Sequence, residues 1–178
     1  MKDVNASTII DFTPELHRQG LEILSHYKTG PIFTPPTMAT LEGRWGTLAA
    51  DMTNGGANWP GGSYDPETQT VYVYSQTTIA AMSIVPVTDP RVSDFEYARG
   101  LPGTTLSAHV TPSESGGLRP GRLTVQGLPL PKPPYGRITA IDLNKGEIAW
   151  QVAHGETPDN IKNHPALKGL KTTRTGRP

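Results

Sequence analysis

The sequence predicts an all-β fold with one short helix. Its 178 residues contain 19 glycines and 18 prolines, a composition that favours turns and short strands over long helices. Two stretches, residues 63–74 and 137–153, have the strand–turn–strand pattern of β-hairpins. One segment, residues 13–30, has the apolar spacing of an amphipathic helix. The length suffices for a single domain with a sizeable core.

Composition excludes several classes of protein. Lysine plus arginine and aspartate plus glutamate number 16 each, so the net charge is zero and a nucleic-acid partner is not expected. Without cysteine, disulfides and thiolate metal sites are impossible. No apolar run approaches the ~18 residues of a membrane span, and the start of the chain lacks the apolar segment of a signal peptide. Metal-ligand spacing is absent among the five histidines, which are His17, His26, His109, His154 and His164.

The helix is predicted over residues 13–30. Thr13 suits the N-cap and Pro14 the first helical position, where its missing N–H costs nothing. Gly30 suits the C-cap, and the proline after it prevents continuation. A surface helix packed on a sheet is expected, with an apolar face made by Leu16, Gly20, Leu24 and Tyr27 and widened by Leu21.

The chain is predicted to form one domain over residues 1–178. Beyond the helix, it divides into four further regions. Residues 44–88 are predicted to form blade-like strands, including Ile79 to Val87, in which Pro86 marks a sheet edge or strand end. Residues 89–134 lack periodicity and predict a long loop, and Asp89 and Asp94 within it are expected to be solvated turn carboxylates. A hairpin over residues 135–153 and an irregular tail over residues 154–178 complete the chain.

The second hairpin contains the spacing Ala140-x-Asp142-x-x-x-Gly146-x-x-x-Trp150. Asp142 can accept hydrogen bonds from the amides of the turn, and Gly146 can adopt the positive φ of a tight turn. Trp150 then returns on the paired strand and can pack its indole against a neighbouring sheet, as one blade of a β-propeller packs on the next. An ordinary hairpin with a buried tryptophan is the alternative.

The segment AIDLNKGEIAW resembles the tryptophan-docking motif of the eight-bladed quinoprotein dehydrogenases, which use pyrroloquinoline quinone. Lys145 departs from the threonine common in that motif. KPPYGRITAIDLNKGEIAWQV and NHPALKGL are similar to the C-terminal half of that family, and YKTGPIFTPPT resembles a segment of its membrane-type glucose-dehydrogenase branch. The resemblance covers most of residues 8–171 and is weak over residues 89–123. It implies a fragment of such a propeller, with about two blades of antiparallel strands.

The resemblance also implies a cofactor wall. GGANWPGGSYDPETQTVYV is similar to the glycine-rich strand that lies near the propeller axis beside the quinone. Asn58 would offer an amide to the oxygens of the cofactor, and Trp59 would supply an aromatic wall. Tyr74, further along, is a weaker candidate for the same role. The glycines around them would let the backbone approach the axis closely.

The catalytic groups of this family are not recognisable in the chain, so the catalytic residues stay unknown. The resemblance implies that calcium ligands and an aspartate base lie in earlier blades, outside this chain. In the whole enzyme, the aspartate would take the hydroxyl proton of an alcohol or aldose while hydride passes to the quinone, and calcium would polarise the quinone. The chain alone, with strands for about two blades, is expected to be inactive.

The resemblance implies several partners. They are the remaining blades, a small alcohol or sugar substrate, and ubiquinone or a cytochrome as electron acceptor. The resemblance also implies that the enzyme is periplasmic, or membrane-associated and facing the periplasm. The alternative function is a non-catalytic β-propeller scaffold that binds proteins. A carbohydrate-binding β-sandwich is disfavoured, because aromatic residues make up only 7% of the chain.

Overall fold

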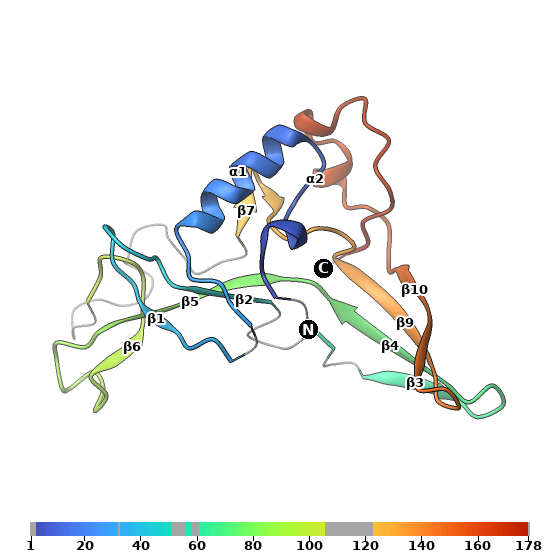
Figure 1. Ribbon diagram of the computed structural model, residues 1–178, viewed down its shortest axis with the longest axis horizontal. Coiled ribbons are helices and arrows are strands. Elements are labelled where there is room, and N and C mark those ends of the chain that lie inside the picture. Colours follow the sequence, from blue (N-terminus) through green and yellow to red (C-terminus); the bar gives the residue numbers. More distant parts are fainter. Residues whose placement is uncertain (1–2, 32, 51–55, 58–60, 106–122, 178) are drawn as a thin grey trace.

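A computed structural model of the chain describes residues 3–31, 33–50, 56–57, 61–105 and 123–177 (Figure 1). The described helices are η1 Ala6–Thr8, α1 Pro14–Ser25, α2 Asp159–Lys162 and η2 Pro165–Leu167. The strands are β1 Thr37–Met38, β2 Thr47–Ala50, β3 Gly62–Asp65, β4 Thr70–Gln76, β5 Ile79–Pro86, β6 Tyr97–Arg99, β7 Thr124–Val125, β8 Leu128–Pro129, β9 Gly136–Asp142 and β10 Glu147–Ala153. Most strands lie in antiparallel sheets, which confirms the predicted fold class and is consistent with a partial β-propeller.

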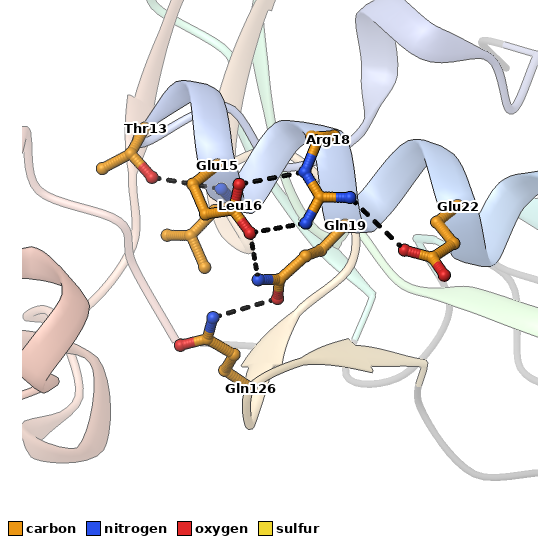
Figure 2. A network of polar contacts seen from close by, with 7 residues as sticks. All are labelled: Thr13, Glu15, Leu16, Arg18, Gln19, Glu22 and Gln126. Atoms are coloured by element: carbon orange, nitrogen blue, oxygen red, sulfur yellow. Dashed lines mark hydrogen bonds and ion pairs between the residues drawn. The ribbon is translucent and has the colours of Figure 1, made fainter.

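Helix α1 begins where the sequence predicts. The Thr13 hydroxyl oxygen accepts a hydrogen bond from the Leu16 N–H at 3.1 Å and caps the first turn. Figure 2 shows the exposed side of the helix, where Glu15 accepts hydrogen bonds from Arg18 and Gln19. Gln19 in turn accepts a hydrogen bond from the Gln126 side chain at 2.9 Å, which joins the helix to the turn between β7 and β8.

The predicted end of this helix is wrong. Helix α1 stops at Ser25, and His26 forms its C-cap rather than Gly30. Lys28 instead pairs with a strand: its N–H donates to the Gly46 carbonyl at 2.8 Å, and its carbonyl accepts from the Leu48 N–H at 2.8 Å. The chain is therefore extended at Lys28, because β2 supplies hydrogen bonds that a further helical turn would have to forgo.

The hydrophobic core lies beneath α1. Leu16 and Gly20 of the helix are buried, as predicted, whereas Leu21 is 38% exposed and does not widen the apolar face. Strand β5 alternates buried and half-buried residues along its length, the period-2 pattern of a strand with one face on a core. The core consists of Val4, Ile9, Ile10, Leu16, Leu48, Ile79, Ala81, Val125, Leu128, Leu130, Tyr135, Ile161 and Leu167.

Part of the predicted long loop belongs to this core. Strand β6 pairs with β5, which also pairs antiparallel with β2 and parallel with β1. Strands β7 and β8 form a small hairpin whose Leu128 is fully buried, as is Leu130 just after it. The sequence missed this hairpin because its strands have two residues each, too few to show a period. Residues 106–122 of the predicted loop lie outside the described residues.

The tail is also more ordered than predicted. Helix α2 and the 3-10 helix η2 place Ile161 and Leu167 in the core, and Thr175 is fully buried. The His164 imidazole accepts a hydrogen bond from the Ala166 N–H, and its other ring nitrogen contacts the Gln126 carbonyl at 2.9 Å. The tail is thereby held against the hairpin that also contacts α1.

The second sheet has four antiparallel strands in the order β10-β9-β4-β3. It joins the two hairpins predicted from the sequence, and it extends away from α1 (Figure 1). The turn of the second hairpin has the predicted chemistry: Asp142 accepts hydrogen bonds from the amides of Asn144 and Lys145, and Gly146 has φ +70°. All seven residues of the central strand β4 are only half-buried.

The prediction that Trp150 is buried is wrong for this chain. Trp150 is 47% exposed, and its ring lies 5.8 Å from that of Tyr72 at a tilted angle. Strand β10 is the outer strand of the sheet, so the indole covers its own sheet. Ile148 and Val152 on the same strand are also exposed, at 60% and 47%. This apolar edge has no covering element among the residues that the structure describes.

Candidate functional site

Backbone segments from distant parts of the chain meet where β4 ends and β9 begins. The Gln76 N–H donates to the Gly56 carbonyl at 2.6 Å, and Gln76 pairs on its other side with Gly136. The His154 N–H donates to the Gly136 carbonyl at 2.9 Å. We call this region, defined by Gly56, Gln76, Gly136 and His154, the glycine-rich end of the sheet.

The C-terminal residues cross the glycine-rich end. The Arg177 N–H donates to the His154 carbonyl at 2.8 Å, and the Tyr135 N–H donates to the Thr175 carbonyl at 2.7 Å. The last described residues of the tail accordingly lie beside the start of β9 (Figure 1). The tail thus adds backbone to this end of the sheet instead of leaving the strands open there.

Tyr74 is the one predicted cofactor residue within the described part of the chain. It lies on β4, two residues before Gln76, and is half-buried. Its ring makes an edge-to-face contact with His154, with ring centroids 5.0 Å apart, and its hydroxyl lies 3.5 Å from the Arg177 carbonyl. The structure therefore brings Tyr74 to the glycine-rich end, where it also supports the crossing tail.

Asn58 and Trp59, the other two predicted cofactor residues, lie outside the described residues. The described chain on either side of them belongs to the site region. Gly56 bonds to Gln76, and Gly62 begins β3, where it pairs with Val73. The assignment of Asn58 and Trp59 to a cofactor wall stays a prediction.

Arg137 is a site residue that the sequence reasoning missed. It is the second residue of β9 and is half-buried. Its terminal Nη2 donates to the Thr77 hydroxyl and, at 3.3 Å, to the Pro134 carbonyl. Its Nε is buried and has no hydrogen-bond partner among the residues that the structure describes. In the sequence Arg137 is a basic residue directly after Tyr135-Gly136 at the start of a strand, and this pattern alone does not mark a binding residue.

Two other titratable groups have structural explanations. Tyr135 is fully buried in the core, and this burial raises the pKa of its phenol above the usual range, with the negative charge of Asp11 adding to the effect. Asp89 accepts the Arg91 guanidinium at 2.7 Å and the Arg91 backbone N–H at 2.9 Å. A solvated turn carboxylate was expected at Asp89. The turn is present, but the Asp89 side chain is only 15% exposed and is ion-paired, so the expectation of a solvated carboxylate is wrong.

The described part of the chain contains no cluster of three or more side chains suited to hold a metal ion. None of its helices has the length and apolar character that crossing a membrane requires.

The fold is consistent with part of a β-propeller, and its four-stranded sheet carries the glycine-rich end. A family model described as "PQQ: Glucose/ethanol/alcohol dehydrogenase, beta-propeller domain" matches residues 1–178. The chain therefore belongs to the β-propeller family of PQQ-dependent dehydrogenases, and the resemblance in its sequence motifs is confirmed.

A curated relative agrees with this assignment. The chain is 31% identical over 134 residues to a protein named "Probable quinate dehydrogenase (quinone)" from Xanthomonas campestris pv. juglandis. The alignment covers 68% of this chain and 17% of that protein, so the chain spans a small part of the relative's length. No solved structure matches the chain.

Proposed function

We propose that this chain is a segment, from the C-terminal half, of a pyrroloquinoline-quinone-dependent dehydrogenase that oxidises an alcohol or aldose carbon. The observation that carries the proposal is the four-stranded sheet with the strand order of a propeller blade, next to the glycine-rich end. All of β4 is half-buried and most of β10 is exposed, as expected of a blade whose neighbours belong to the rest of the protein. The family assignment supports the same function.

The residues of this chain fit a planar, anionic cofactor. Gly56 and Gly136 bring backbone close together at the sheet end, and the Nε of Arg137 is a hydrogen-bond donor without an acceptor among the described residues. Asn58, Trp59 and Tyr74 would form the wall, with the amide of Asn58 as donor and the two aromatic rings as apolar surface. When bound, pyrroloquinoline quinone supplies the two-electron acceptor of the reaction.

The residues of this chain bind and orient the cofactor, and groups in other blades carry out the proton transfer. Calcium is part of the proposal, with its ligands outside this chain, and so is an aspartate base. The electron acceptor is ubiquinone or a cytochrome, in an enzyme that is periplasmic or membrane-associated and faces the periplasm. Residues 89–134 would line part of the substrate mouth, except for the stretch around β7 and β8 that packs in the core.

The substrate proposed is a small alcohol or sugar. The name of the curated relative gives quinate, a secondary alcohol with a ring, as its substrate and a quinone as its acceptor. Quinate is therefore a specific candidate within the proposed class, along with glucose.

The test uses the full-length protein that contains this chain. The protein would be freed of metal and cofactor, reloaded with calcium and pyrroloquinoline quinone, and supplied with glucose, simple alcohols or quinate while dye reduction is followed. Turnover that needs the quinone supports the proposal. Quinone-independent turnover contradicts the proposed cofactor, and failure of the protein both to bind the quinone and to turn over favours the scaffold function.

A further inference from the structure

Arg137 differs from the other arginines of the described chain. Each of the others has an exposed side chain, whose guanidinium water can solvate, whereas Arg137 is half-buried. Three of the exposed arginines form ion pairs as well: Arg18 with Glu15, Arg91 with Asp89, and Arg174 with Glu156. Among described residues, no carboxylate pairs with Arg137.

A half-buried cation without an anion is costly. Removing part of a guanidinium from water sacrifices hydration that a paired carboxylate normally replaces. The Thr77 hydroxyl and the Pro134 carbonyl are neutral acceptors, and both are taken by Nη2. Within the described chain, Nε therefore remains a donor without a partner, and the positive charge of Arg137 is uncompensated.

The position of Arg137 is fixed by the fold. Its backbone pairs with Ser75 of β4 on one side and with Ala153 of β10 on the other, one residue from Gln76 and His154 of the glycine-rich end. The Thr77 N–H donates to the Tyr135 carbonyl at 2.7 Å, which holds Thr77 in place as an anchor for the guanidinium. The side chain is thus oriented before any ligand arrives, which lowers the entropic cost of binding.

We propose that Arg137 binds a carboxylate of the ligand that enters the glycine-rich end. Guanidinium groups match carboxylates in geometry and form charge-assisted hydrogen bonds with them. The inference rests on the proposed function, and two ligands of such an enzyme can supply the group. One is pyrroloquinoline quinone, which carries carboxylates on its ring system, and the other is a hydroxy-acid substrate.

The experiment compares three variants of the full-length protein. Arg137→Gln removes the charge but keeps a polar side chain, and Arg137→Lys keeps the charge without the planar fork. Arg174→Gln is the matched control, because Arg174 lies in the same tail that crosses the glycine-rich end but is neutralised by Glu156 at 3.1 Å. Circular dichroism and thermal unfolding establish that each variant is folded.

The first arm titrates each cofactor-free variant with pyrroloquinoline quinone and measures the dissociation constant by equilibrium dialysis. A cofactor carboxylate on Arg137 predicts a dissociation constant raised about ten- to hundredfold in Arg137→Gln. Arg137→Lys recovers part of that loss, and Arg174→Gln stays at the wild-type value.

The second arm compares quinate with its methyl ester, which keeps the hydroxyl groups and removes the charge. A substrate carboxylate on Arg137 predicts unchanged cofactor affinity, with the KM for quinate raised about ten- to hundredfold in Arg137→Gln and the KM for the ester unaffected.

Unchanged cofactor affinity in Arg137→Gln, together with no selective loss for quinate, overturns the inference while leaving the proposed function intact. Wild-type protein that fails to bind pyrroloquinoline quinone overturns the proposed function itself, and the inference falls with it.

Discussion

The carbonyl oxygen of Arg177 lies 1.9 Å from the position that a Cβ atom would occupy on Gly136. Only a glycine at the start of β9 lets the tail cross this closely. The crossing is held by the hydrogen bonds from Arg177 to His154 and from Tyr135 to Thr175. The glycine-rich end and the C-terminal tail are therefore one packing unit, although Gly136 and Arg177 are 41 positions apart in the sequence (177 − 136).

We expect Gly136→Ala to lower the free energy of unfolding by about 1–3 kcal/mol, because the backbone of the tail must move to admit the methyl group. Urea unfolding of the full-length protein measures the loss. A double-mutant cycle with deletion of residues 175–178 is the control. If the tail is the cause, Gly136→Ala costs much less in the deletion background, and an equal cost in both backgrounds contradicts the explanation.

Helix α1 should contribute an acid-dependent component to stability. The hydrogen bond from Arg18, with a second from Gln19, lowers the pKa of Glu15 from 4.5 to about 2. A carboxyl whose pKa is depressed in the folded state stabilises that state above its ordinary pKa and loses this contribution as pH falls. We expect Glu15→Gln to lower thermal stability at neutral pH and to lessen its decline between about pH 4.5 and 2.

Circular dichroism as a function of pH checks this expectation. Glu42→Gln, which changes an exposed carboxylate outside the helix, serves as the control and should keep the wild-type pH profile. The effect is small because Glu15 is fully exposed, so identical profiles for Glu15→Gln and the wild type would show that solvent screens the pair completely.

Trp59 is expected to contribute to cofactor binding. In the full-length protein, Trp59→Ala should weaken the affinity for pyrroloquinoline quinone by about tenfold to a hundredfold, equivalent to about 1–3 kcal/mol of lost aromatic contact. Equilibrium dialysis measures the change. Trp150→Ala is a matched control for loss of an indole, since Trp150 packs on Tyr72 at the outer strand. Unchanged affinity in Trp59→Ala would assign Trp59 a purely structural role.

The local elements of this fold were predictable because their causes are local. Thr13 caps the helix that it precedes, and Asp142 with Gly146 forms the turn between β9 and β10. The end of α1 was not predictable, because the hydrogen bonds that extend the chain at Lys28 come from β2. The prediction that Trp150 is buried was wrong for a related reason. A docking tryptophan is buried by a neighbouring sheet, and no such sheet among the described residues covers Trp150.

The candidate site was likewise predictable only in part. Tyr74 could be proposed from the family resemblance of its strand, and the structure places it at the glycine-rich end. Arg137 could not be identified from the sequence, because its interest lies in the absence of a carboxylate partner among described residues. That absence depends on which backbone segments meet at the end of the sheet. Patterns in a single sequence do not show which segments meet there.

The isolated 178-residue chain should self-associate. Ile148, Trp150 and Val152 form an exposed apolar edge on β10, and an outer strand also presents unpaired backbone groups. We expect Trp150→Ser to shift the chain toward monomer in sedimentation velocity. Leu41→Ser, which removes an apolar side chain that is 67% exposed elsewhere, should leave the association unchanged. A monomeric wild-type chain would contradict the expectation.

The isolated chain should also fail to oxidise alcohols. Catalysis of this kind needs a metal and a base held around one substrate carbon, and the sequence contains no recognisable set of either. Affinity for pyrroloquinoline quinone should also be weak, because Asn58, Trp59 and Tyr74 provide one side of a cofactor that the remaining blades would enclose. The assay adds calcium and the quinone to residues 1–178 and follows dye reduction with glucose and simple alcohols, beside the full-length protein. Turnover by the isolated chain above a protein-free control would mean that it holds the catalytic groups, with Asp89 and Asp94 the first carboxylates to substitute.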